Sequence, residues 1–285
     1  MQHSDQIARG ERFEFGQNWQ RFLGSFDQSR VDEAKRSLQS MLECDDLSGK
    51  NFLDIGCGSG LFSLAARQLG AKVHSFDYDP QSVGCTRELK RRFFFQDGSW
   101  KIEEGSALDA EYLKNLGSFD IVYSWGVLHH TGNMRLGLAN ATIPVRESGV
   151  LYIAIYNDQG AISKFWTGIK KAYCSGVLGR MAVKAVFVPY FACESLAIGL
   201  VKYRNPLGHI LNYKKKRGMS IYHDWIDWLG GYPFEVARRE EIISFYKEAG
   251  FELRRLEQTN RHGCNQYVFQ RSGRASEDGQ RPETR

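Results

Sequence analysis

Residues 51–60 read NFLDIGCGSG, a short apolar strand that runs directly into a glycine-rich turn. Gly56, Gly58 and Gly60 remove side chains where the backbone must turn sharply and where a ligand must come close. An apolar helix opens at residues 61–66, immediately after the turn. The stretch therefore predicts a nucleotide-like ligand at a helix N-terminus, at the carboxyl end of the first strand of a parallel sheet.

The spacing of the glycines narrows the choice of ligand. A dinucleotide fingerprint needs a glycine three places after Gly58, but position 61 is leucine. The turn also lacks the Lys-Ser/Thr pair of a phosphate-binding P-loop. What remains is Asp54-x-Gly-x-Gly-x-Gly with Cys57 inside it, which resembles motif I of the class I S-adenosylmethionine (SAM) methyltransferases. An ordinary glycine turn of an α/β protein is the alternative.

This resemblance implies that the turn holds SAM, whose cationic sulfonium and α-amino group suit an acidic residue at the strand end. Residues 71–77 read as the second strand, and Asp77 at its end lies 23 positions after Asp54. In dinucleotide folds an acidic residue about 20 positions on holds the ribose hydroxyls. By resemblance, Asp77 would hold the ribose of SAM and Tyr78 would lie against the adenine. The alternative role of Asp77 is a helix cap or turn.

Residues 104–109 follow the expected third strand, and in this family that segment borders the adenine. The family often has an acidic residue after the glycine, whereas Ser106 stands there in this chain, followed by Ala107. Both are expected at the cofactor, although the exact adenine contact departs from the family pattern. Asp109 could substitute for the missing acid, or it could cap the next helix.

Residues 119–123 resemble the fourth strand of the family, whose end faces the transferred methyl group. Ser124 and Trp125 are expected at the cofactor, and the Val-Leu-His-His run at 127–130 resembles many small-molecule methyltransferases. The Asp/Asn-Pro-Pro-aromatic signature of amino-methyltransferases is absent from the sequence. The Pro-Cys nucleophile of cytosine C5 methyltransferases is absent as well.

His129 and His130 are candidate general bases because they follow this fourth strand and because histidine titrates near neutral pH. A hydroxyl acceptor must lose its proton to such a base during transfer. Packing or capping of the next helix is the alternative role for either residue. His223, oriented by Asp224, is the rival base.

A metal is not favoured at this turn. Some related quinone O-methyltransferases carry Glu-His there and use a divalent cation, whereas Leu128 precedes the histidine pair in this chain. The histidines and Asp158 could still form a metal site.

Length and composition bound the class of protein. The chain has 285 residues, enough for one large α/β domain with an elaboration, and its hydrophobic content of 42% supports a full core. Its six cysteines include no Cys-x-x-Cys pair, which fits a reducing cytosol better than a disulfide framework or a zinc site. The polar first six residues do not resemble a signal peptide, so a cytoplasmic location is expected.

The predicted fold is α/β, a Rossmann-like, seven-stranded, mostly parallel sheet with an antiparallel last strand. A helical insertion is expected between strand five and the last helix. Strand five is expected at 149–156, the last helix at 236–250, and the final strands at 251–256 and 265–269. The predicted organisation is an N-terminal helical cap (1–50), a SAM-binding core (51–156), a helical insertion that shapes the substrate site (157–235), a last helix and strand hairpin (236–270) and a disordered tail (271–285).

The insertion sets the charge of the protein. Residues 157–235 contain 11 basic and 5 acidic residues, an excess of six, against a net charge of +5 for the whole chain. Residues 177–201 are apolar but are interrupted by charges and Pro189, which argues against a transmembrane span and predicts two short amphipathic helices. A membrane-surface helix with basic flanks, suited to a lipid-linked acceptor, is the alternative. The basic run 214–217 could attract phosphate or carboxylate groups, or be a solvated turn.

Residues 218–235 combine Trp, Tyr, His and Asp with a Gly-Gly turn, a composition that suits a pocket lining. A structural hairpin with buried aromatics is the alternative. Together with residues 13–22, this segment resembles a bacterial methyltransferase subgroup in which the N-terminal part is expected to fold over the SAM site. The expected substrate-binding residues are Trp19, Tyr156, Asn157, His223, Asp224 and Tyr232.

The function expected from the sequence is SAM-dependent O-methylation of a small molecule, or of a glycan- or lipid-linked metabolite, with a histidine base. Peripheral membrane contact through the insertion would suit a lipid-linked acceptor. One alternative is an RNA methyltransferase that uses the basic insertion, but no RNA-binding module is visible and nucleic acid is not favoured. The other is a SAM-binding regulatory protein without catalysis.

Overall fold

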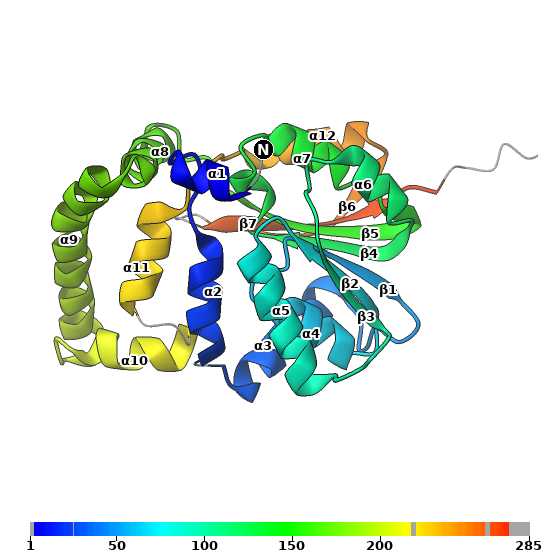
Figure 1. The fold of residues 1–285 in the computed structure, drawn as a ribbon, viewed down its shortest axis with the longest axis horizontal. Coiled ribbons are helices and arrows are strands. Elements are labelled where there is room, and N and C mark those ends of the chain that lie inside the picture. Colours follow the sequence, from blue (N-terminus) through cyan, green and yellow to red (C-terminus); the bar gives the residue numbers. More distant parts are fainter. Residues whose placement is uncertain (1–2, 25, 218–220, 260–262, 274–285) are drawn as a thin grey trace, which may run out of the picture.

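A computed structural model of the chain describes residues 3–24, 26–217, 221–259 and 263–273. Its centre is a seven-stranded sheet in the order β3-β2-β1-β4-β5-β7-β6 (Figure 1). All neighbouring strands are parallel except β7, which runs antiparallel to β5 and β6, so the predicted fold class is confirmed. The strands are β1 (Asn51–Ile55), β2 (Lys72–Asp77), β3 (Trp100–Glu104), β4 (Phe119–Trp125), β5 (Val145–Tyr156), β6 (Phe251–Glu257) and β7 (Cys264–Arg271).

Helices cover both faces of the sheet, which is why the central strands are apolar on both sides. Leu53 and Ile55 of β1 pack into one core, and Phe52 packs into the other. The core that contains Leu53 is covered by α6 (Ala110–Asn115), α7 (Met134–Asn140) and α12 (Arg239–Glu248). The core that contains Phe52 is covered by α3 (Gln28–Leu42), α4 (Leu61–Gln68) and α5 (Pro80–Phe93).

The insertion after β5 forms a separate group of helices beside the sheet (Figure 1). Helix α2 stands between this group and α5 in Figure 1, so the N-terminal segment joins the two parts. The insertion has its own apolar cluster, built around Tyr173, Phe191 and Leu229. The helices concerned are α1 (His3–Ala8), α2 (Phe15–Gly24), α8 (Ala161–Cys174), α9 (Val177–Tyr203), α10 (Gly208–Arg217) and α11 (Ile221–Gly230).

The prediction of two short helices in residues 177–201 is wrong, because α9 is one helix of 27 residues that contains Pro189. Proline removes one backbone donor and crowds the preceding turn. The helix nevertheless continues, since Val183 and Phe187 before the proline and Phe191 after it all pack into the same cluster of the insertion.

Several expected boundaries also move. β5 begins at Val145, earlier than the expected 149, and its pairing with β4 has a register irregularity near Phe119. α12 begins only at Arg239, because the backbone N–H of Arg238 is bonded to Glu241 at 3.1 Å in a capping arrangement. Within the predicted disordered tail, residues 274–285 lie outside the described residues.

Candidate functional site

The glycine turn is held tightly against its surroundings. Gly56 has φ +76°, and a Cβ there would lie 2.3 Å from a methyl of Val127, so only glycine fits. The backbone N–H of Gly58 donates to Oδ2 of Asp77 at 2.9 Å. A Cβ on Gly58 would lie 3.2 Å from the indole of Trp19, so this α2 side chain covers the turn. The turn, the end of β2 and the N-terminal helix therefore meet at one point.

Asp77, the acidic group that the sequence predicts to hold the ribose, is fixed beside the glycine turn. Its Oδ2 accepts from Gly58 and its Oδ1 accepts from the backbone N–H of Asp79 at 2.9 Å. A carboxylate has about four acceptor positions, so two remain for hydroxyl donors. Burial raises the pKa of Asp77 to about 6, and its two backbone hydrogen bonds oppose this rise. It is therefore ionised at neutral pH, with acceptor capacity to spare.

A cavity of about 820 Å³ lies beside the ends of β2 and β3. Tyr78 and Asp79 line it from the β2 end, Ser106 lines it from the β3 end, and His3 and Ile7 of α1 close the other side. The size of the cavity, the aromatic ring of Tyr78 and the adjoining Asp77 suit an adenosine group. The residues present thus fit the cofactor that the glycine turn indicates.

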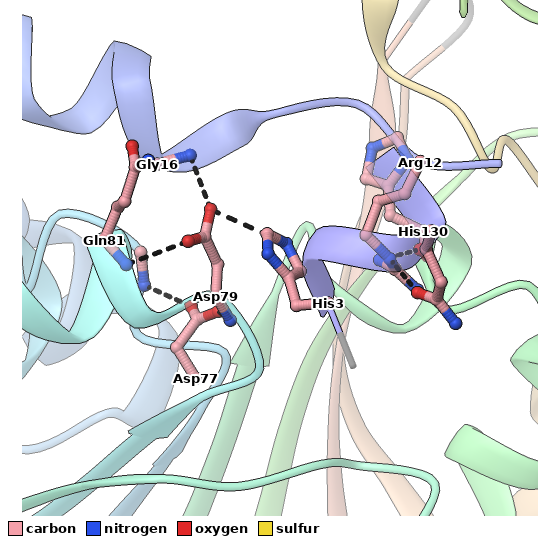
Figure 2. Close-up of polar contacts among 9 residues, drawn as sticks. His3, Arg12, Gly16, Asp77, Asp79, Gln81 and His130 are labelled. Atoms are coloured by element: carbon pink, nitrogen blue, oxygen red, sulfur yellow. Dashed lines mark hydrogen bonds and ion pairs between the residues drawn. The ribbon is translucent and has the colours of Figure 1, made fainter. Parts of the chain in front are cut away.

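The N-terminal segment forms a strap over this cavity. The backbone N–H of Gly16 donates to Oδ2 of Asp79 at 2.8 Å, and Nε2 of His3 lies 3.8 Å from the same oxygen (Figure 2). Arg12 donates to the carbonyl oxygens of His130 and Thr131 at 2.9 and 3.2 Å. Its guanidinium carbon also lies 5.2 Å from the ring centre of Tyr78. The strap therefore connects the end of β2 to the turn after β4.

Removing the Arg12 contacts should loosen this strap. We expect Arg12→Ala to weaken SAM binding by about tenfold, because each hydrogen bond from a charged group contributes about 1.5–3 kcal/mol and only part of that reaches the cofactor. Isothermal titration with SAM measures the effect, with exposed Arg9→Ala as the matched control. Equal affinity in Arg12→Ala and the unmodified protein would show that the strap does not support the cofactor site.

His130 is held in one defined tautomer. Its Nδ1 lies 2.5 Å from the carbonyl oxygen of Pro233, so Nδ1 carries the proton and donates it. Burial lowers the pKa of His130 to about 3, which keeps the ring neutral at physiological pH. A neutral ring with a proton on Nδ1 leaves a lone pair on Nε2, where it can accept a proton.

Aromatic side chains surround the histidine pair. The ring of Tyr156 lies 4.3 Å from that of His129 and 5.7 Å from that of His130, measured between centroids. Phe234 lies 5.0 Å from Tyr156, and Trp228 lies 6.0 Å from it. His129 is only 1% exposed, and burial lowers its pKa well below the usual value. The pair and Tyr156 are therefore brought together within an apolar setting, and their roles stay predictions.

Lys170 of α8 is a charged group that the sequence did not single out. Its Nζ donates to the carbonyl of Trp228 and lies 4.1 and 4.8 Å from the ring centres of Trp228 and Phe234. Burial lowers the pKa of Lys170 to about 7, and its charge helps to lower the pKa of His130. In the sequence, Lys170 and Lys171 look like an ordinary solvated helix face, so no local pattern reveals this environment.

Asp54 and Cys57 lie behind the turn. Asp54 is 3% exposed and accepts from the hydroxyl of Ser63 at 2.5 Å, and burial raises its pKa to about 7. The sulfur of Cys57 accepts from the hydroxyl of Thr86 at 3.2 Å. Gly60 caps the start of α4. Asp54 thus anchors the turn from inside the core through Ser63, and a direct contact with SAM stays a prediction.

The other predicted cofactor residues lie after β3 and at the end of β4. Ser106 lines the cavity, whereas Ala107 is buried and its carbonyl accepts from Asn140. Asp109 accepts from the backbone N–H of Tyr112 at 3.0 Å and so caps α6. At the end of β4, Ser124 is buried against the Ile55 carbonyl, and Trp125 is 43% exposed with its indole N–H on Gln266.

The predicted substrate residues are spread more widely. Asn157 is bonded to Asn265 at 3.3 Å, at the start of β7. Asp224 accepts from the hydroxyl of Tyr213, between α10 and α11. The carbonyl of Tyr232 accepts from the Phe13 backbone, which ties the insertion to the strap. The side chain of His223 and those of residues 214–217 lie outside the described part of the chain, so their predicted roles stay predictions.

One structural observation bears on whether the histidines and Asp158 form a metal site. Within the described ranges, no three His, Cys, Asp or Glu side chains are placed to hold a metal ion. Asp158 accepts from the backbone N–H of Gly160 at 2.8 Å, in the turn that leads into α8.

Comparison with known proteins establishes the family. The methyltransferase-domain family matches residues 46–212, more than half of the chain. The chain belongs to this family. Its SAM-binding, Rossmann-like core is thereby confirmed, and its cofactor is SAM.

The curated relatives align over the core. The ubiquinone biosynthesis O-methyltransferase of Sinorhizobium fredii is 32% identical over 112 residues, which are 39% of this chain and 43% of that protein. The ribosomal protein L11 methyltransferase of Vibrio campbellii is 50% identical over 52 residues, 18% of each chain. The methyltransferase chain thus spans less than half the length of these relatives.

Two solved structures share the fold over most of the chain. Magnesium protoporphyrin IX methyltransferase from Synechocystis has a TM-score of 0.50 and 16% identity, over 86% of this chain and 83% of that one. An O-methyltransferase family protein from Burkholderia thailandensis has a TM-score of 0.52 and 14% identity, over 87% of this chain and 56% of that one.

Proposed function

We propose that this methyltransferase transfers the methyl group of SAM to an oxygen atom of a small-molecule acceptor, with His130 as the general base. The observation that carries the proposal is the position of His130 just after β4, with Nδ1 fixed by the Pro233 carbonyl and Nε2 left to accept a proton. Sequence relatives named as ubiquinone O-methyltransferases support oxygen as the accepting atom.

The chain supplies orientation and a proton acceptor. SAM, when bound, supplies an activated methyl group on a good leaving group. Asp77 and the cavity below the strap fix the cofactor, and the rings of Tyr156, Trp228 and Phe234 give the acceptor flat apolar walls that exclude water. Nε2 of His130 would take the proton of the acceptor hydroxyl as the hydroxyl oxygen bonds the methyl carbon and the carbon–sulfur bond of the cofactor breaks.

Lys170 supports this step electrostatically. A nearby cation favours the ionised form of an acceptor hydroxyl and so lowers the pKa of that hydroxyl. The same charge lowers the pKa of the His130 imidazole and so makes the ring a weaker proton acceptor, which means that the support from Lys170 acts on the acceptor hydroxyl. The ammonium group is also surrounded by Trp228 and Phe234, two walls of the same aromatic cluster. In its protonated form, Lys170 therefore gives the aromatic cluster a positive charge that is not exposed to solvent.

The buried amine should make stability depend on pH. The pKa of Lys170 is about 7 in the folded protein, against an ordinary value of 10.5, so above pH 7 the unfolded chain binds more protons and stability rises with pH. Urea unfolding should show a rise of at most about 1.4 kcal/mol per pH unit between about pH 7 and 9. Lys170→Met should lack this rise, and exposed Lys171→Met should keep it. If the free energy of unfolding depends on pH in the same way in Lys170→Met and in the unmodified protein, the Lys170 charge lies in solvent.

A screen with labelled SAM tests the proposed reaction. The full chain is incubated with separate phenols, sugars, carboxylic acids and RNA, and transferred label is counted after SAM is removed. Label on a phenol or other hydroxyl compound is the expected result. Label on RNA alone would favour the nucleic-acid alternative, and no transfer to any class despite SAM binding would favour the regulatory alternative.

A further inference from the structure

The outward side of α9 is apolar along its whole length. We call the outer stripe the exposed residues Leu178, Ala182, Val186, Pro189, Leu196 and Leu200, which recur at helical spacing. Leu178 is 84% exposed, Val186 63% and Leu200 58%. The surface face of a soluble helix normally carries charged and polar side chains. The outer stripe carries none.

The charged residues of α9 lie on the side of the helix that faces away from the stripe. The Arg180 guanidinium and the Lys184 ammonium lie 5.6 and 5.9 Å from the ring centre of Tyr173 on α8. Helical spacing places Glu194 and Lys202 on that side as well. The charges that interrupt the sequence of α9 thus leave its outward side uninterrupted.

The opposite side of α9 is fixed to the protein. Val183, Phe191, Ser195 and Gly199 are buried, and α9 packs along α8, α10 and α11. In length and composition alone α9 would suffice to cross a membrane, but this packing keeps it on the insertion. Figure 1 shows it as the outermost helix, on the far side of the insertion from the sheet. The outer stripe is therefore a firmly supported surface.

Exposed apolar side chains also lie on the neighbouring helices, and the charge of the insertion indicates which partner the stripe would take. Phe165 of α8 is 54% exposed and Leu211 of α10 is 63% exposed. The insertion has 11 basic and 5 acidic residues between positions 157 and 235. A second copy of the chain would bring two positively charged insertions together, which is repulsive. A bilayer with anionic headgroups complements both the apolar stripe and the positive charge.

We propose that the outer stripe docks on an anionic lipid bilayer, with the axis of α9 in the plane of the membrane surface. The apolar side chains would enter the boundary between headgroups and acyl chains, and the net positive charge of the insertion would attract the anionic surface. Helix α9 is a surface anchor in this arrangement, and the sheet stays in water.

The docked surface is close to the proposed acceptor site. Phe191 of α9 lies 5.9 Å from Trp225, and Trp166 of α8 lies 5.4 Å from Trp228, between ring centroids. Trp228 in turn contacts Tyr156 of the aromatic cluster. If the proposed function holds, an amphipathic acceptor could reach the site from the bilayer. The docking itself does not rest on the proposed function.

Vesicle flotation tests the docking without SAM or acceptor. The full chain is mixed with vesicles of phosphatidylcholine and phosphatidylglycerol, and separately with phosphatidylcholine alone. We expect flotation with the anionic vesicles and much less with the neutral ones. The double variant Leu178→Glu, Leu200→Glu should lose at least about tenfold in vesicle affinity. Phe95→Glu, which changes a side chain 72% exposed beside the sheet domain, is the matched control and should bind normally.

Three outcomes would overturn the proposal. Failure of the unmodified protein to float with anionic vesicles rejects it outright. Equal flotation of the double variant places the lipid contact elsewhere on the chain. A dimer in solution that the double variant dissociates, without vesicle binding, assigns the stripe to a second copy. Circular dichroism confirms that the variants are folded, and a chain that floats but transfers no methyl group would leave the docking intact.

Discussion

Replacing His130 with asparagine is expected to slow methyl transfer by about 10²- to 10⁴-fold, the usual contribution of a general base. The asparagine amide can still donate to the Pro233 carbonyl, which the imidazole bonds at 2.5 Å, but it cannot take up a proton. SAM affinity should change by less than about threefold, because Arg12 of the strap bonds the backbone carbonyl of His130, which the substitution keeps.

Turnover is measured on the acceptor that the labelling screen selects, and SAM binding is measured by titration calorimetry. His130→Ala serves as the comparison that removes both the base and the bond to Pro233. If asparagine restores most of the turnover that alanine loses, His130 is a positioning residue and the base is another group. Normal turnover in both variants would remove His130 from the mechanism.

Replacing Asp77 with asparagine is expected to weaken SAM binding by about tenfold to a hundredfold. Hydrogen bonds to a charged group contribute about 1.5–3 kcal/mol, and about 1.4 kcal/mol corresponds to a factor of ten. The carboxylate also fixes the glycine turn through the N–H of Gly58, so its loss affects both sides of the cofactor. Asp109→Asn is the matched control, because asparagine also caps helices well and Asp109 serves as the cap of α6.

The same carboxylate should make SAM binding sensitive to acid. The pKa of Asp77 is raised by burial to about 6, so the group gains a proton as the pH falls through that value. The protonated acid accepts fewer hydrogen bonds, and SAM affinity should fall below about pH 6 in the unmodified protein. Asp77→Asn should show weak binding without this pH dependence. An acid-induced loss that persists in Asp77→Asn would assign it to another group.

The sheet and the glycine turn were predictable because their causes are local. Positive φ and close approach demand glycine at positions 56 and 58, and buried strands show as apolar runs in the sequence. The position of Asp77 follows from the length of one strand–helix–strand unit. These features indicate the family before any long-range contact is known.

The electrostatics of the acceptor site could not be predicted in the same way. Lys170 is buried by Trp228 and Phe234, which lie about sixty positions away along the chain, and no local pattern links them. Arg12 donates hydrogen bonds to carbonyl groups that lie more than a hundred positions away along the chain. Helix α9 was predicted as two pieces because its charges were counted along the sequence, whereas in space they lie to one side of the helix.

The chemical identity of the transferred group tests the central claim most directly. The full chain is incubated with isotope-labelled SAM and the acceptor found in the screen, and the labelled methyl is located by NMR and mass spectrometry of the product. We expect one labelled methyl group bonded to oxygen, and almost none from His130→Asn or Asp77→Asn. A labelled methyl on nitrogen or carbon, or undiminished product from both variants, would contradict O-methylation at this site.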